Sequence, residues 1–143
     1  MPTSDRGRTD ALVDTSAAVA LVVEDHAHHV AVRAALTGRR LGLAGHAAFE
    51  TYSVLTRLPG SARRSATVVG EILRRSFPGS AFLPTEAAAA LLVRLPELGL
   101  AGGAVYDALV GAASRHHGLV LVTRDRRAAA TYRTLDVDHE LIG

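Results

Sequence analysis

The 143-residue sequence contains no cysteine, lysine, asparagine, glutamine or tryptophan. Without cysteine, the chain can form neither a disulfide nor a thiolate metal site, which fits a cytosolic protein. Without lysine, it lacks the residue on which Walker-type phosphate loops and Schiff-base enzymes depend. The absences therefore exclude these classes of site, and we expect a cytoplasmic protein.

Aromatic residues and long apolar runs are also scarce. Three phenylalanines and three tyrosines are few for a platform that stacks several bases of a single-stranded nucleic acid. No uncharged apolar run reaches the roughly 18 residues of a membrane span, so we expect no membrane segment. The polar start "MPTSDRGRTD" lacks the apolar run of a signal peptide. We predict a flexible tail over residues 1–9 and a single domain over residues 10–143.

All 16 basic residues are arginines, and with 14 acidic residues they give a formal net charge of +2. Several arginines occur in pairs, at Arg39-Arg40, Arg63-Arg64, Arg74-Arg75 and Arg126-Arg127. Such pairs lie either on solvated helix faces or against nucleic-acid phosphates. The net charge does not decide between these interpretations.

Short apolar runs alternate with helical patterns along the chain. The runs predict strands at 11–14, 40–45 and 119–123, with further candidates at 80–85 and 139–142. Helical spacing predicts helices at 15–25, 26–37, 46–58, 63–75, 85–95, 104–118 and 124–135. Short, uniformly apolar strands that alternate with helices predict an α/β fold, with a parallel sheet covered by helices on both faces.

Four acidic residues occupy comparable places in this pattern. Asp14 ends the first strand, and Asp125 follows the strand "LVLVT". Glu50 and Asp107 are expected in the first turns of the helices at 46–58 and 104–118. Because loops at the carboxyl ends of parallel strands converge on one crevice, we expect the four carboxylates to meet there, with that of Asp14 at its mouth.

Each acid also has a simpler interpretation. Asp14 and Asp125 can act as helix N-caps, and Glu50 and Asp107 can complement a helix dipole. Clustered carboxylates raise one another's pKa, whereas a divalent cation favours their ionised forms. Oxygen ligands without cysteine suit Mg²⁺ or Mn²⁺. A bound ion of this kind can activate water and neutralise charge on a phosphate.

Four segments resemble a known family. "LVDTSAAVALV", "HAAFETYSVLTRLP", "GGAVYDALVGAASRHHG" and "LVLVTRDRR" are together similar to the PIN domain, and more narrowly to VapC-type toxins of bacterial toxin–antitoxin pairs. The resemblance covers about residues 10–142. It implies a three-layer α/β fold with a short central parallel sheet and an acidic Mg²⁺ or Mn²⁺ site.

By this resemblance, the acidic quartet is Asp14, Glu50, Asp107 and Asp125. The positions that match Asp14 and Asp107 are the usual direct metal ligands, while the other two acids complete the site. Ser16 and Thr123 match hydroxyl residues that often accompany the first and last acids. Some family members carry a further acid after the last aspartate. Arginines and alanines follow Asp125 here, which weakens the case for a second metal ion.

The resemblance implies a toxin that cleaves RNA as an endoribonuclease, through a metal-activated water held by the quartet. It also implies a homodimer and a cognate antitoxin protein. Arg57 and Arg124 are candidates for contact with RNA phosphates. Two alternatives stay open, namely a nuclease that acts on single-stranded or structured DNA, and a non-catalytic RNA-binding regulatory module.

Other functions and sites are less consistent with the residues. Phosphoaspartate receivers and haloacid-type phosphatases also begin with a strand and an aspartate, but both rely on a lysine that this chain lacks. His26 and His29 have a metal-ligand spacing, but no third ligand is evident. We expect His46 to cap its helix or line the acidic crevice, and Tyr52 to lie in the core.

Overall fold

The computed structural model describes residues 7–143, which fold around a four-stranded sheet. Its strands are β1 (Ala11–Val13), β2 (Leu41–Leu43), β3 (Val120–Thr123) and β4 (His139–Leu141). Their order is β2-β1-β3-β4, and all three pairings are parallel. The predicted α/β fold is therefore confirmed. The strand candidate at 80–85 is wrong, because that segment forms only an isolated bridge between Ala81 and Ala44.

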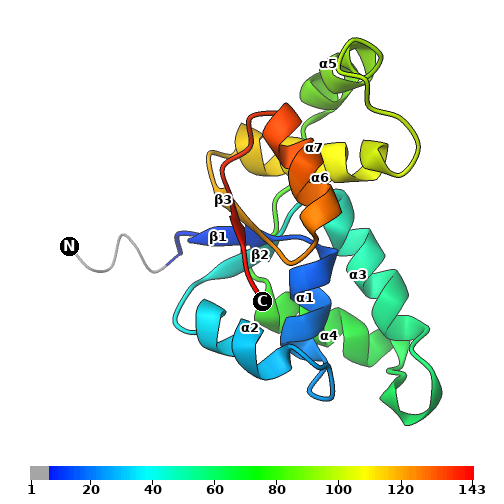
Figure 1. Ribbon diagram of the computed structural model, residues 1–143. Helices are drawn as coiled ribbons and strands as arrows, with labels where there is room; N and C mark the ends of the chain where they lie inside the picture. The colour runs from blue at the N-terminus through cyan, green and yellow to red at the C-terminus, as the bar shows by residue number, and fades with distance from the viewer. Residues whose placement is uncertain (1–6) are drawn as a thin grey trace.

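Helices fill most of the remaining chain (Figure 1). Within residues 7–143 they are α1 (Thr15–Val22), α2 (His29–Leu36), α3 (His46–Thr56), α4 (Ala66–Ser76), α5 (Thr85–Arg94), α6 (Ala104–His116), α7 (Arg126–Thr134) and the short 3-10 helix η2 (Gly60–Ala62). Each α-helix corresponds to a predicted range, and most end earlier than predicted, whereas α4 extends one residue further, to Ser76. For example, α1 stops at Val22 because Val23 adopts an extended backbone, with φ −96° and ψ 103°.

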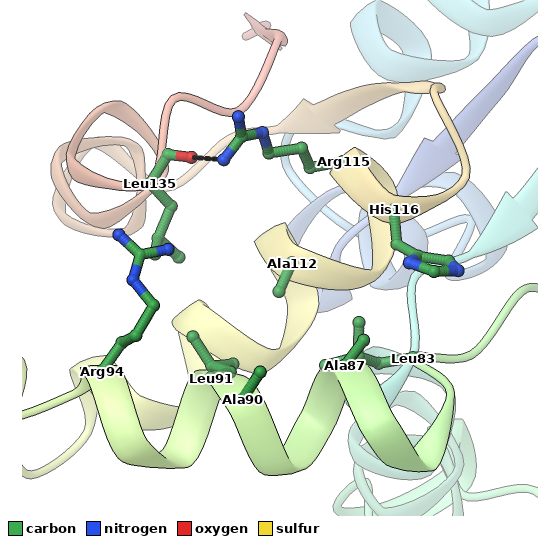
Figure 2. A pocket seen from close by; sticks show the side chains of 9 residues that line it. All are labelled: Leu83, Ala87, Ala90, Leu91, Arg94, Ala112, Arg115, His116 and Leu135. Atoms are coloured by element: carbon green, nitrogen blue, oxygen red, sulfur yellow. Dashed lines mark hydrogen bonds between the residues drawn. The ribbon is translucent and has the colours of Figure 1, made fainter.

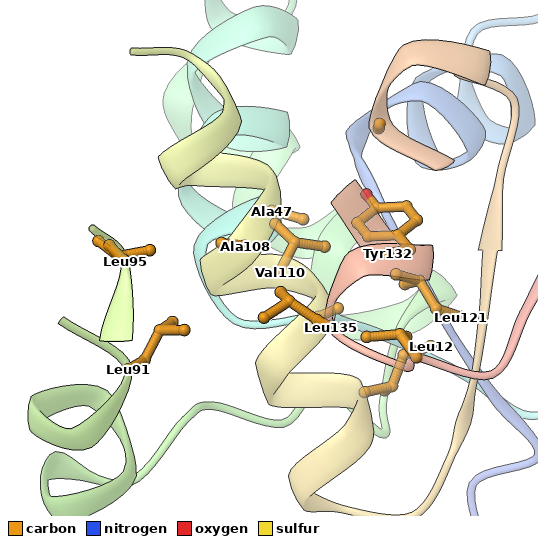
Figure 3. Close-up of a cluster of buried hydrophobic side chains, with 12 residues drawn as sticks. Leu12, Ala47, Leu91, Leu95, Ala108, Val110, Leu121, Tyr132 and Leu135 are labelled. Carbon is orange, nitrogen blue, oxygen red and sulfur yellow. The ribbon is translucent and has the colours of Figure 1, made fainter. Parts of the chain in front are cut away.

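Side chains of the sheet alternate between two hydrophobic clusters. Leu12 and Leu121 belong to the cluster that α5, α6 and α7 cover, and Figure 3 shows them near Val110 and Tyr132. Neighbouring residues of β1 point the other way, so Ala11 and Val13 join the cluster beneath α1 and α2. The sheet is thus the middle of three layers, as the family resemblance implies.

The carboxyl ends of the central strands lead directly into the helices of the candidate site. β1 leads through Asp14 into α1, and β3 leads through Arg124 and Asp125 into α7. β2 leads into α3 through Gly45, whose positive φ of 52° disfavours other residues. In Figure 1, α1 runs down from the end of β1 beside α3. The connections therefore bring residues distant in sequence to one edge of the sheet.

The buried face of α3 differs from the predicted one. The helix buries Ala47, Thr51 and Leu55, which lie four residues apart along one side. Tyr52 is 40% exposed, so its predicted place in the core is wrong. The core stripe of α3 contains a threonine and a small alanine, and its apolar character was therefore not evident from the sequence.

Two other expectations concern the chain as a whole. No helix within residues 7–143 combines the length and apolar character that a bilayer crossing demands. The predicted tail over residues 1–9 falls largely outside the described residues, which begin at Gly7. From Asp10 onward the chain is tied to the sheet edge, since the Asp10 amide donates to the Arg40 carbonyl at 2.8 Å.

Candidate active site

Four acidic side chains line one small pocket at the carboxyl edge of the sheet. The pocket has a volume of about 70 Å³ and is lined by Asp14, Thr15, Ser16, Glu50, Asp107, Val110, Asp125, Ala128 and Tyr132. The four acids come from the start of α1, from α3, from α6 and from the start of α7. The structure thus brings together all four acids that the sequence singles out.

Asp14 lies deepest in the pocket and is 5% exposed, so it is not at the mouth as expected. Its Oδ1 accepts hydrogen bonds from the Ser16 hydroxyl at 2.6 Å and the Ala17 amide at 3.2 Å. Its Oδ2 accepts from the Thr123 hydroxyl and, at 3.0 Å, from the Tyr132 hydroxyl. Four donors occupy the roughly four acceptor positions of a carboxylate, so Asp14 is a stabilised buried charge as well as the N-cap of α1.

Ser16 and Thr123 join the ends of β1 and β3. Each hydroxyl donates a hydrogen bond to Asp14 and accepts one from a backbone amide. The Ser16 hydroxyl accepts from the amide of Arg124 at 2.8 Å, and the Thr123 hydroxyl accepts from the amide of Asp125 at 3.0 Å. The two hydroxyl oxygens are 3.4 Å apart. Because each has a single proton, already donated to Asp14, this contact carries no hydrogen bond. The two predicted supporting residues therefore orient Asp14 and the backbone that leads to Asp125.

Asp125 and Glu50 complete the acidic lining of the pocket. Asp125 caps α7, since its Oδ1 accepts from the amides of Arg127 at 2.9 Å and Ala128 at 3.3 Å. Glu50 is the fifth residue of α3, which begins at His46 as predicted, so it lies in the second turn and its expected place in the first turn is wrong. Its carboxylate accepts from the Thr15 hydroxyl at 3.2 Å and lies 3.4 Å from Nε2 of His46.

Asp107 lies in the first turn of α6, as predicted. Partial burial raises the pKa of its carboxyl to about 6, and the carboxylates of Asp125, Asp14 and Glu50 add to the shift. The guanidinium of Arg127 opposes it. The pocket therefore concentrates more negative charge than its surroundings neutralise, and a proton or a cation stabilises it.

The donor set matches a hard divalent cation in charge and chemistry. Every charged side chain that lines the pocket is a carboxylate, and Mg²⁺ and Mn²⁺ favour oxygen ligands. As the side chains stand, no group of three or more His, Asp or Glu residues within 7–143 is arranged to hold an ion. The carboxylate of Asp14 accepts hydrogen bonds from four protein donors. A cation can bind it directly only if at least one donor moves away and frees a lone pair of the carboxylate.

The two arginines predicted to contact RNA do not line this pocket. Arg57 is exposed just beyond the end of α3, about 10 Å along the helix from Glu50. Nε of Arg124 is buried close to Gly143, at the C-terminal end of the chain. Arg127 instead lines an adjoining pocket of about 350 Å³ together with Asp107 and Asp125. The pair Arg126-Arg127 directly after Asp125 is the signal that could have identified it.

Tyr132 is a second residue of the site that the sequence did not reveal. It is 1% exposed on α7, and its burial raises the pKa of the phenol, as does the charge of Asp14. Tyr132 therefore stays protonated and donates to Asp14. Gly111 on α6 makes room for the ring, since a Cβ there would lie 2.9 Å from Cδ1 of Tyr132.

A larger pocket lies between α5 and α6 (Figure 2). It measures about 340 Å³ and is lined mainly by alanine and leucine, with Arg94, Arg115 and His116 at its edges. Arg115 donates to the carbonyl of Leu135 at 3.2 Å across its far side. Because no acid lines it, this pocket lacks the groups that metal-dependent hydrolysis requires.

Several known proteins are similar to this chain in sequence or in fold. Residues 11–134 match the PIN domain family. Ribonuclease VapC27 of Mycobacterium tuberculosis is 42% identical over 125 residues, which cover 87% of this chain and 91% of that protein. Ribonuclease VapC40 of the same organism is 43% identical over 132 residues, 90% of this chain and 96% of that protein. The crystal structure of PAE2754 from Pyrobaculum aerophilum superposes with a TM-score of 0.54 at 25% identity, over 89% of this chain and 93% of that one.

Proposed function

The chain belongs to the PIN-domain family, and we propose that it is the toxin of a toxin–antitoxin pair and acts as a metal-dependent endoribonuclease. The observation that carries the proposal is the meeting of four carboxylates from four separate elements in one pocket. Its similarity to two ribonucleases over most of their length supports RNA as the substrate. The same similarity favours this activity over DNA cleavage and over a non-catalytic role.

In this proposal, Asp14 and Asp107 bind Mg²⁺ or Mn²⁺ directly, while Glu50 and Asp125 complete the site. When bound, the cation supplies an activated water and neutralises charge on the scissile phosphate. Partial burial, with the nearby carboxylates, raises the pKa of Asp107 to about 6. This supports its role, because a bound cation would stabilise the ionised carboxylate. The absence of a further acid after Asp125 favours a single tightly held ion.

The neighbouring residues position these ligands and the substrate. Ser16, Thr123 and Tyr132 fix the carboxylate of Asp14 through their hydroxyls. Arg127, in the adjoining pocket, is placed to contact an RNA phosphate beside the acids. Arg57 and Arg124 stay predictions for phosphate contacts farther along the RNA.

Partners complete the proposal. A VapC-type toxin acts in the cytoplasm as a homodimer, and a cognate antitoxin neutralises it. Exposed apolar surface supports a contact between subunits, since Phe49 and Phe82 are 66% and 50% exposed and their rings are 6.1 Å apart. A guanidinium of the antitoxin placed among the acids would form a charge-assisted clamp of the kind that carboxylates favour.

A cleavage assay on purified RNA tests the activity. We expect cleavage with Mg²⁺, no cleavage in EDTA, and loss of cleavage in the variants Asp14→Asn and Asp107→Asn. Asp138→Asn, at an exposed position that does not line the pocket, is the matched control and should cleave normally. Persistent cleavage in EDTA would contradict the metal-dependent mechanism, and RNA binding without cleavage would favour the regulatory module.

The substrate and the biological role need separate measurements. RNA and single-stranded DNA of equal sequence, assayed side by side, decide the substrate, and we expect only the RNA to be cut. Expression of the chain alone should arrest bacterial growth, whereas the Asp14→Asn variant should not. Normal growth with the active chain would count against a toxin.

A further inference from the structure

Most aromatic side chains of this protein lie on its surface. Phe77 and Tyr132 are buried, whereas the other four of the six, Phe49, Tyr52, Phe82 and Tyr106, are at least 40% exposed. Single exposed apolar side chains are common, whereas exposed rings that lie together can mark a binding site. Their number is small for an extended nucleic-acid platform, so the position of each ring relative to the acids is what matters.

One of these rings, Tyr106, is stacked against a histidine at the edge of the acidic pocket. The ring centroids of His46 and Tyr106 are 5.0 Å apart, and their planes differ by 24°. The two residues begin different helices, since His46 is the first residue of α3 and Tyr106 lies in the first turn of α6. Tyr106 remains 52% exposed, so His46 covers only part of its ring.

His46 lies beside one member of the acidic quartet, and Tyr106 is the sequence neighbour of another. Nε2 of His46 lies 3.4 Å from the carboxylate of Glu50, and Tyr106 directly precedes Asp107 in α6. The stacked pair therefore borders the place where the proposed function puts the scissile phosphate. Arg127 lies in the pocket that Asp107 and Asp125 line on another side.

We propose that the His46–Tyr106 pair is a base-stacking shelf, on which one unpaired nucleobase of the RNA rests beside the scissile phosphate. The inference depends on the proposed function and adds two residues that bind the substrate beside the acids. A base held in a duplex is stacked on its neighbours and cannot reach such a shelf, so the substrate is single-stranded at the cut. Stacking tolerates any base, because every base has a π-face.

The surroundings of the pair favour a nucleotide over a protein partner. Charged residues are depleted at the centres of protein interfaces, whereas Glu50 lies 3.4 Å from His46 and Asp107 follows Tyr106 in the sequence. The rings also present a phenol and an imidazole, not aliphatic surface. The pocket formed by His46, Phe49 and Phe82 is more apolar, and Phe49 and Phe82 suit the subunit contact proposed above.

Replacement of Tyr106 tests the shelf. Tyr106→Leu should weaken binding of a short single-stranded RNA about tenfold in fluorescence anisotropy with EDTA present, since one base stack is worth about 1–3 kcal/mol. With Mg²⁺, the same variant should raise KM for RNA cleavage about tenfold and leave kcat within about twofold. Tyr106→Phe keeps the ring and should match the wild type in both assays. Thermal unfolding verifies that both variants are folded.

A probe without bases separates stacking from charge. An oligomer of ribose phosphates that lacks nucleobases carries the same phosphates, and Tyr106→Leu should leave its binding unchanged. Equal RNA binding and equal KM in Tyr106→Leu and the wild type would overturn the shelf. The proposed function would still stand in that case, provided that the wild type cleaves RNA. Conversion of a dimer to a monomer by Tyr106→Leu in sedimentation would assign the ring to a subunit contact and also overturn the shelf. Absence of both RNA binding and cleavage in the wild type would refute the proposed function and the shelf together.

Discussion

The hydroxyl of Tyr132 donates a 3.0 Å hydrogen bond to Oδ2 of Asp14, a residue 118 positions earlier in the chain. The bond connects α7 to the end of β1 beneath the acidic pocket. With the hydroxyls of Ser16 and Thr123 and the amide of Ala17, it gives Asp14 four donors. A carboxylate this deeply buried depends on such donors to stay charged.

Loss of the Tyr132 hydroxyl should destabilise the fold. Hydrogen bonds to buried charged groups contribute about 1.5–3 kcal/mol, so Tyr132→Phe should lower the free energy of unfolding by about 2 kcal/mol and Tm by about 5 °C. The matched control is Tyr106→Phe, which removes a hydroxyl from a half-exposed ring and should change Tm by under about 1 °C. Thermal unfolding in EDTA measures both, and equal Tm values for the two variants would show that the bond to Asp14 contributes nothing.

An added methyl group beside the ring of Tyr132 should also lower the stability of the fold. A methyl group on Gly111 would lie 2.9 Å from Cδ1 of Tyr132 and 3.1 Å from Cγ2 of Val137. Gly111→Ala should therefore cost about 1–3 kcal/mol through overpacking. Gly70→Ala in α4, where nothing lies within 4 Å, should instead stabilise the helix by about 0.5–1 kcal/mol. Urea titration distinguishes these opposite signs, and stabilisation by both changes would contradict the described packing.

The carboxylate cluster should make stability depend on pH when no metal is bound. The pKa of Asp107 is raised from 3.8 to about 6, so the folded state holds its proton more tightly than the unfolded chain does. Stability from this group is present below about pH 4 and is lost as pH rises through 6. Asp107→Asn removes the partly buried charge and its repulsion by the other acids. It should be about 1 kcal/mol more stable than the wild type at pH 7, a value reduced because the group is only half-buried.

Thermal unfolding in EDTA between pH 4 and pH 7 measures this effect. The advantage of Asp107→Asn should vanish near pH 4, where the wild-type carboxyl is protonated in the folded state. Asp138→Asn serves as the control and should track the wild type throughout. An advantage of the same size at both pH values would indicate a cause other than the charge of Asp107.

Adjacent arginines should differ in their effect on RNA binding. Arg127 lines the pocket beside Asp107 and Asp125, whereas Arg126 is exposed and lines none of the pockets described here. Arg127→Gln should weaken RNA binding and reduce the slope of log K against log salt by about 0.7, the loss of one phosphate contact on a single strand. Arg126→Gln should change neither quantity. Equal slopes for both variants would remove Arg127 from the RNA path.

The layers of the fold and the gathering of the acids were predictable from the sequence. Short apolar runs rich in β-branched residues, such as "LVLVT", favour buried strands, and the residues that follow parallel strands lie at one edge of the sheet. The ends of the strands alone thus predicted that Asp14 and Asp125 belong to the site. The same prediction for Glu50 and Asp107 depended on their helix positions and on the resemblance to the family. The helix of Glu50 begins at His46 as predicted, but Glu50 is its fifth residue and therefore lies in the second turn, not the first.

Ser16 and Thr123 were expected from the family resemblance, but the places of Tyr132 and Arg127 were not predictable, because they depend on how helices pack. Tyr132 belongs to a helix that the sequence indicates, but its approach to Asp14 depends on the close contact at Gly111. Arg127 was one of several paired arginines, and only the turn from Asp125 into α7 sets it apart. The exposure of Tyr52 has the same origin, since Thr51 takes the buried face of α3.

Direct measurement of metal binding tests the central claim, that the four acids form one cation site. Calorimetric titration with Mn²⁺ should show binding to the wild type and to the control Asp138→Asn. Binding should be lost or weakened at least about tenfold in Asp14→Asn and in Asp107→Asn, because each removes a charged ligand from the same ion. Unchanged Mn²⁺ affinity in both pocket variants would contradict the account, since the ion would then lie elsewhere on the protein.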